Sequence, residues 1–299
     1  MANDAPISLR MASPVGWMGR QVLARLAYMG GIASVLTLAL GSLFQKRGAT
    51  DSLPLAVSGQ LSWIFAMGFP LVALVHVGLG SFLSMQSYFG GTFVEGTGAV
   101  VGVGLLRNVA ALMSGLTMAG FLAARITPEL RGKWRVAPGA GAELFDQSAS
   151  GLVSRPAPVE GFDPGRDVAS RIIAAALAGP ILSFWGALVG TVVGWRVSGA
   201  LIGVSTNTFF DMFFMMVWVR DVVGLGVKGL LFGFAASLLA CYEGLRASPE
   251  DDFASVSAAA CRAACLSCLA ILVINSGWFI LVYHAGPAFG PTLMAPVTP

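Results

Sequence analysis

Three cysteines near the C-terminus are spaced so that they could ligate a metal cluster. Cys261, Cys265 and Cys268 form a C-x3-C-x2-C string, similar to the cluster-binding strings of radical enzymes. Ligand cysteines of that kind lie on a loop that can wrap a cluster, whereas these lie in the apolar run RAACLSCLAILVINSGWFILV. Spacings of four and three residues place them on one face of a helix, where cysteine acts as a small packing residue. We therefore expect helix packing rather than a metal site, and no disulfides.

Ionisable residues also interrupt other apolar segments, where a charge at bilayer depth is costly. Arg107 lies about ten residues into such a segment, with no acidic residue one helical turn away. Its guanidinium fork suits a phosphate, so we expect it to face a polar cavity or a ligand phosphate; the alternative is that it reaches the outer interface. Asp221 precedes Lys228 by about two turns. Either the two bracket a wet crevice, or Asp221 lies at the interface and Lys228 snorkels.

Motifs for covalent chemistry are missing from the sequence. His76 has no second histidine or carboxylate at metal-ligand spacing, so we expect a packing residue. The chain contains no G-x-S-x-G, H-E-x-x-H or G-x-x-x-x-G-K-[ST] motif. We predict no catalytic and no metal-binding residues, and any ATP must bind to a separate subunit.

The composition indicates the elements that position these residues. Of 299 residues, 56% are hydrophobic and 11% are charged, whereas about 25% are charged in soluble domains. A membrane span needs roughly 20 apolar residues. Five segments meet this need: 61–89, 98–124, 172–195, 221–243 and 262–284. The small net charge of +3 and the lack of a basic, aromatic surface argue against nucleic acid as a partner.

The N-terminal segment, residues 1–60, is expected to contain an amphipathic helix that lies in the membrane interface. Its stretch PVGWMGRQVLARLAYM places Trp17, Val22 and Leu26 on one face, away from Arg20 and Arg25. Basic residues flank the following apolar run on both sides, which fits a crossing poorly. A cleaved signal peptide that ends near Gly41 is the alternative.

The distribution of basic residues predicts the orientation of the chain. Residues 125–171 hold seven of its eighteen Lys and Arg residues, and such residues are retained on the cytoplasmic side. We predict an all-α membrane protein of about five transmembrane helices, with the N-terminus and a loop of about 125–171 in the cytoplasm and the C-terminus outside. Within the loop, AELFDQSASGL could form a short helix, with disorder as the alternative. Residues 201–219 are expected to form an outer interfacial helix, because Asp211 falls in the middle of this apolar stretch.

Four stretches also carry a family resemblance. Residues 104–131, GLLRNVAALMSGLTMAGFLAARITPELR, resemble the second-span signature of the MlaE/YrbE permeases, approximately L-L-R-E-x-G-P, then A-G-R, then T-A-E. MQSY at 85–88, FDPGRDVASRIIAAALAGPIL at 162–182 and DVVGLGVKGLLFG at 221–233 follow the same order. The matching residues in the first stretch are Leu105, Leu106, Arg107, Ala119, Gly120, Thr127 and Glu129.

The chain departs from the family pattern at several positions. Asn108 stands where the family has Glu, Ala110 and Ala111 replace Gly-Pro, and Phe121 replaces an arginine. A longer Pro- and Gly-rich loop replaces the family's coupling helix. Such departures are expected if the chain is one half of a heteromeric permease pair and another chain supplies the half that matches the family pattern better.

The resemblance implies a function and a set of partners. Residues 61–299 would be the permease domain of an ABC transporter in the bacterial inner membrane, with a periplasmic C-terminus. It would move phospholipid or a related hydrophobic lipid between that membrane and an MCE-protein tunnel. The implied partners are an ABC ATPase that binds ATP and Mg, an MCE-domain protein and a second permease subunit, with a heterodimer favoured over a homodimer. No cofactor is implied on this chain.

Specific residues follow from the resemblance. Those implied for lipid binding are Gln86, Tyr88, Arg107, Asp221 and Lys228. Those implied for coupling to the ATPase are Glu129, Arg131, Asp163 and Arg166. The alternative function is a divergent structural or regulatory subunit that completes the permease without contacting substrate.

Overall fold

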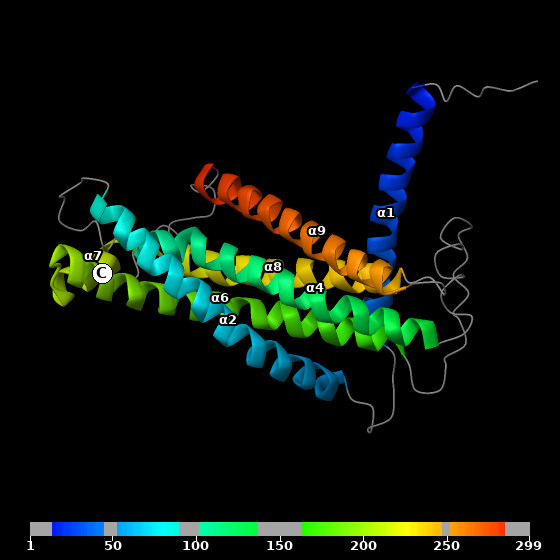
Figure 1. Ribbon diagram of the computed structural model, residues 1–299, viewed down its shortest axis with the longest axis horizontal. Coiled ribbons are helices and arrows are strands. Elements are labelled where there is room, and N and C mark those ends of the chain that lie inside the picture. Colours follow the sequence, from blue (N-terminus) through cyan, green and yellow to red (C-terminus); the bar gives the residue numbers. More distant parts are fainter. Residues whose placement is uncertain (1–13, 45–52, 90–101, 137–162, 247–251, 285–299) are drawn as a thin grey trace, which may run out of the picture.

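The computed structural model describes residues 14–44, 53–89, 102–136, 163–246 and 252–284. Every element in these ranges is helical, which confirms the predicted all-α class (Figure 1). The α-helices are α1 (Pro14–Leu43), α2 (Leu53–Phe89), α4 (Ala110–Val136), α6 (Pro164–Ile202), α7 (Thr206–Met216), α8 (Val219–Leu245) and α9 (Phe253–Phe279). Two π-helical turns, η1 (Leu105–Val109) and η3 (Ile280–His284), adjoin α4 and α9.

Within the described residues, six helices are long and apolar enough to cross a membrane, so the chain is a multi-pass membrane protein. These segments are Trp17–Leu43, Leu53–Ser87, Gly102–Lys133, Pro164–Leu201, Val219–Leu245 and Phe253–Val282. The last five correspond to the five spans predicted from the sequence. The first belongs to α1, whose two parts, the amphipathic stretch and the apolar run, form one continuous helix.

Helix α1 lies across the long helices rather than along them (Figure 1). Its packing on the bundle begins at Tyr28, which contacts Tyr242 of α8, and continues through Gly31, Val35 and Ala39 at four-residue spacing. Trp17 and Leu26 in its first half are exposed, at 58% and 62%. If the long helices run along the membrane normal, a transverse α1 lies in the membrane plane. The interfacial position of this helix stays a prediction, because Trp17–Leu43 also has the length and hydropathy of a span.

Helix α7 is too short to be a span. Its 11 residues measure about 16 Å, roughly half the hydrocarbon thickness. Gly203, at φ 75°, ends α6 in the left-handed region, and the Ser205 side chain then caps α7. Asp211 is exposed on α7. A short helix is therefore present within residues 201–219, while its place in the outer interface stays a prediction.

The centre of the molecule is a close contact between α6 and α8. Ala175 and Gly179 on α6 face Gly229 and Gly233 on α8 with four-residue spacing on both sides. A Cβ atom on Gly179 would lie 2.0 Å from the Gly229 carbonyl oxygen, and one on Gly233 would lie 2.1 Å from the Ala175 carbonyl oxygen. Small residues thus let the two backbones touch, as is usual between membrane helices.

The cysteine string lies on α9, as predicted, but its packing role within this chain is not borne out. Cys261 and Cys265 are exposed, and Cys268 is half-buried. The buried face of α9 is the adjacent one, which contains Ala259, Ala263, Ser267, Ile271 and Asn275. In the described ranges, no group of His, Cys, Asp and Glu residues could hold a metal ion.

Both ends of the predicted 125–171 loop are helical in the structure. Helix α4 continues to Val136 and α6 begins at Pro164, while residues 137–162, with the stretch AELFDQSASGL, lie outside the described ranges. The helices extend past the apolar segments because the charges in these turns are paired. Arg125 bonds to Glu129 on α4, and Arg171 bonds to Asp167 on α6.

Candidate functional site

Arg107 lies in the π-helical turn η1, and its guanidinium has two partners from other elements. Nε donates to Asp221 Oδ2 at 3.1 Å, and Nη2 donates to the Met216 carbonyl oxygen at 2.9 Å. No acidic residue lies one helical turn from Arg107 along its own helix, and its carboxylate partner, Asp221, comes from α8 instead.

Asp221 organises the start of α8 as well as Arg107. Its Oδ2 accepts a hydrogen bond from the Trp218 backbone N at 3.1 Å, while its own backbone N donates to the Trp218 carbonyl oxygen at 2.9 Å. These bonds fix the first turn of α8. The carboxylate side chain is fully buried.

Lys228 lies two turns further along α8 and also points to η1. Its Nζ donates to the Arg107 carbonyl oxygen at 2.6 Å, and the residue is only 1% exposed. A π turn displaces backbone carbonyls from regular helical pairing, and here the ammonium binds one of them. Lys228 and Asp221 are both buried within the protein, and each binds a group of Arg107.

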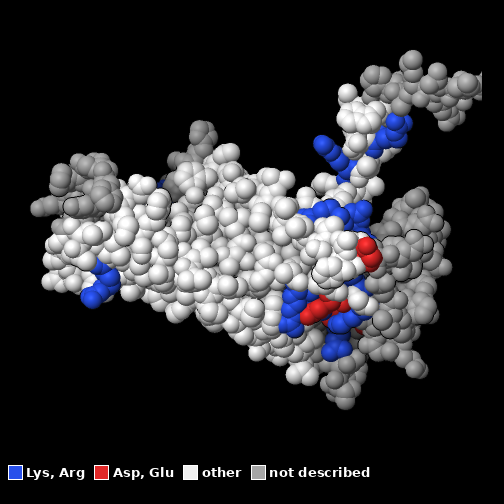
Figure 2. All heavy atoms as spheres, in the orientation of Figure 1, with Lys and Arg blue, Asp and Glu red and all other residues white. Residues whose placement is uncertain are grey.

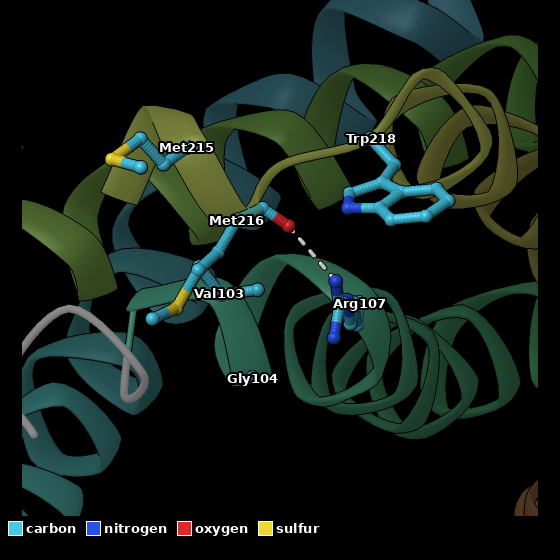
Figure 3. A pocket seen from close by; sticks show the side chains of 6 residues that line it. All are labelled: Val103, Gly104, Arg107, Met215, Met216 and Trp218. Atoms are coloured by element: carbon cyan, nitrogen blue, oxygen red, sulfur yellow. Dashed lines mark hydrogen bonds between the residues drawn. The ribbon is translucent and has the colours of Figure 1, made fainter. Parts of the chain in front are cut away.

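A cavity of about 280 Å³ adjoins the guanidinium of Arg107. Its lining residues are Val103, Gly104, Arg107, Met215, Met216 and Trp218 (Figure 3). Arg107 is the charged member of this otherwise apolar set, and its side chain is 33% exposed. The volume lies near the lower end of the roughly 300–1,000 Å³ typical of ligand pockets. It suits a lipid headgroup better than a whole lipid.

Two further cations lie near the carboxylate of Asp221. Arg220 Nε lies 3.9 Å from Asp221 Oδ1, and its guanidinium stacks 4.5 Å from the Trp218 ring centroid. Within the described part of the chain, Arg107, Arg220 and Lys228 therefore surround one carboxylate. Such a group favours an anionic ligand.

The other two predicted lipid-binding residues are not part of this arrangement as described. Gln86 is exposed near the end of α2 and does not line the cavity. The side chain of Tyr88 lies outside what the structure describes. The sequence analysis did not identify Met216 and Trp218, although both lie within five residues of the start of the DVVGLGVKGLLFG stretch, which was the available signal.

Charged side chains gather at the opposite end of the long helices, with a largely uncharged surface between (Figure 2). One group joins α4 to α6. Glu129 accepts from Arg125 and from Arg171 Nη1, the latter at 2.9 Å. Asp167 Oδ2 accepts from Lys133 Nζ at 3.0 Å and from Arg171 Nη2 at 3.2 Å.

The predicted ATPase-coupling residues all lie at this end, in different environments. Glu129 belongs to the group just described and is partly exposed. Arg131 is buried and donates to the carbonyl oxygens of Arg246 and Ser255. Asp163 caps α6 through hydrogen bonds from the Gly165 and Arg166 backbone N atoms. Arg131 and Asp163 thus make hydrogen bonds to backbone groups that the sequence alone did not indicate.

His76 is a buried packing residue, as predicted. Its Nδ1 lies 2.7 Å from the Val72 carbonyl oxygen. A Cβ atom on Gly186 would lie 2.5 Å from the imidazole Cε1, so glycine on α6 makes room for the ring.

Comparisons with known proteins agree with this architecture. Residues 159–280 match the family model described as Permease MlaE. Probable ABC transporter permease proteins of Rickettsia bellii and Rickettsia felis are 28% and 27% identical over 188 residues, which cover 62% of this chain and 67% of each relative. The intermembrane phospholipid transport system permease protein MlaE of Haemophilus influenzae is 23% identical over 274 residues, 90% of this chain and 97% of that protein. These matches confirm the resemblance predicted from the sequence: over residues 159–280 the chain is similar to the MlaE permeases, and its similarity to ABC transporter permease proteins extends beyond that stretch.

Proposed function

We propose that this permease subunit moves phospholipid, or a related hydrophobic lipid, and that the cavity beside Arg107 receives the headgroup. The observation that carries the proposal is one partly exposed arginine in an otherwise apolar cavity. The name of the Haemophilus influenzae relative supports phospholipid as the substrate class.

The geometry suggests how a headgroup binds. Nε and Nη2 of Arg107 are held by Asp221 and Met216, so the guanidinium is oriented before a lipid arrives. The phosphate then meets the Nη1 edge and can compete for Nη2. Val103, Met215 and Met216 surround the ester region, and the acyl chains stay on the apolar surface outside.

Partners complete the proposed transporter in the bacterial inner membrane. An ABC ATPase, which binds ATP and Mg, would dock at the charged end that contains Glu129. An MCE-domain protein would receive lipid at the cavity end, and a second permease subunit would close the lipid path. The charged end is cytoplasmic in this proposal, because basic residues concentrate there, and the C-terminus is periplasmic.

A structural subunit that contacts no substrate is the second candidate. One observation favours it: Asp221 and the Met216 carbonyl already satisfy much of the Arg107 guanidinium. Asn108, in place of the family's glutamate, points the same way.

Substitution of Arg107 distinguishes the two candidates. Arg107→Ala should lower the phospholipid that co-purifies with the assembled complex about 10-fold or more, since a charge-assisted contact contributes roughly 1.5–3 kcal/mol. Arg107→Lys should restore loading only in part, because it keeps the charge without the fork. Unchanged loading in a correctly assembled Arg107→Ala complex would favour the structural subunit.

A further inference from the structure

A second cationic site lies where α1, α8 and α9 meet, at the end opposite the cavity. Its centre is Glu243 of α8, whose carboxylate is fully buried. Tyr28 of α1 donates to Oε1 at 2.9 Å, and Arg262 of α9 donates to Oε2 through Nε at 3.3 Å and Nη2 at 3.2 Å. Arg246 Nη1 completes the set at 3.4 Å from Oε1. We call these four residues the Glu243 cluster.

The two arginines of the Glu243 cluster present positive charge to the outside. Glu243 supplies one negative charge, whereas Arg246 and Arg262 supply two positive charges, and their side chains are 44% and 52% exposed. Arg246 also stacks over the ring of Tyr28, at 5.4 Å from its centroid. The carboxylate thus holds the arginines in place from within, while their outer edges remain accessible to a second anion.

The position of the Glu243 cluster along α8 matches a membrane interface. Glu243 follows Asp221 by 22 residues, or about 33 Å of helix, which is close to the roughly 30 Å thickness of a bilayer core. If the cavity lies near one interface, the Glu243 cluster lies near the other. Phosphate groups of lipids are found at that depth.

Exposed apolar side chains lie on the same two helices as Tyr28 and Arg262. On α1, Leu26 and Met29 are 62% and 68% exposed beside Tyr28. On α9, Leu269 is 57% exposed, about two turns deeper than Arg262. A soluble anion would gain nothing from these surfaces, whereas acyl chains below a bound phosphate would cover them.

We propose that the Glu243 cluster binds the headgroup of an anionic phospholipid, with its acyl chains against α1 and α9. Basic sites between membrane helices near the cytoplasmic surface are suited to such lipids. The site does not depend on the cavity beside Arg107, and it would fasten the transverse α1 to the bundle through lipid as well as through Tyr28.

Lipid titration of the purified full-length protein tests the proposal, in an Arg107→Ala background that weakens the other site. Acyl-labelled phosphatidylglycerol and phosphatidylcholine serve as probes, and fluorescence anisotropy gives their dissociation constants. We expect phosphatidylglycerol to bind about tenfold more tightly, and Arg246→Gln to remove this preference while phosphatidylcholine binding stays the same. Arg246→Gln leaves Tyr28 and Arg262 on Glu243, so the buried carboxylate remains paired.

Two further variants control for geometry and for general surface charge. Arg262→Lys keeps a cation near Glu243 without the fork and should give an intermediate preference. Arg196→Gln removes an arginine that stacks on Trp195, at 5.4 Å, away from the Glu243 cluster, and should change nothing. Equal affinity for the two lipids before mutation, or a loss of preference in Arg196→Gln as large as in Arg246→Gln, would overturn the proposal.

Discussion

At the scale of single residues, the candidate site depends on contacts between helices. The sequence indicated Arg107, Asp221 and Lys228 because each places a charge in or beside an apolar segment. Their pairing could not be predicted, since Arg107 and Asp221 are 114 residues apart and helical spacing finds neighbours on one helix only. The π turn at η1 and the hydrogen bond from Lys228 to its carbonyl had no signal in the sequence.

Asp221 should both stabilise the folded protein and orient the guanidinium of Arg107. Asp221→Asn removes the charge that Arg107 Nε and the Trp218 backbone N share. We expect a loss of about 1.5–3 kcal/mol, measured as a lower thermal unfolding midpoint, together with weaker lipid loading. Asp211→Asn, on the exposed surface of α7, should leave both quantities unchanged. Wild-type stability and loading in Asp221→Asn would show that this carboxylate does not position Arg107.

At the scale of elements, the sequence predicted which segments are helical better than where they end. Uncharged runs placed the five spans well, because length and hydropathy suffice to recognise them. The ends extend further: Asp163 and Asp252 cap α6 and α9, and ion pairs at the charged end of α4 and α6 keep ionisable residues helical. Burial of a helix face was not predictable in the same way. The spacing of the cysteines on α9 shows that they share one face, but it does not reveal whether that face is buried.

The contact between α6 and α8 should tolerate no added side chain. Gly233→Ala would place a Cβ atom 2.1 Å from the Ala175 carbonyl oxygen, so the helices must separate. We expect a lower yield of folded protein and a reduced unfolding midpoint in detergent. Gly226→Ala is the matched control on α8, because its Cβ atom would make an ordinary 3.6 Å contact with Phe184. Equal behaviour of the two variants would contradict the close α6–α8 packing.

At the scale of the whole molecule, two polar sites lie at opposite ends of a largely uncharged body (Figure 2). The cavity beside Arg107 occupies one end, and the charged residues of α4, α6 and α8 occupy the other. Their separation along α8, about 33 Å, matches the hydrocarbon thickness. The proposed lipid site at one end and the proposed ATPase-docking site at the other fit a transporter in which lipid binding and ATP hydrolysis occur on different faces of the membrane.

The proposed orientation can be tested by labelling from each side of the membrane. A cysteine introduced at position 146, in a variant that lacks the four native cysteines, should react with an impermeant thiol reagent only after the cytoplasmic face is opened. The reason is the concentration of basic residues in 125–171. Labelling of intact cells from outside would reverse the arrangement and move the proposed ATPase site to the wrong face.

The central claim is that a phospholipid headgroup occupies the cavity beside Arg107. A photo-crosslinking residue at Met215, which lines the cavity, should capture phosphorus-labelled phospholipid in cells, and Arg107→Ala should reduce that capture severalfold. The same residue at Leu74, exposed on α2, should capture surrounding membrane lipid equally with and without Arg107. If Arg107→Ala leaves lipid capture at position 215 unchanged, as is expected at position 74, the claim is contradicted.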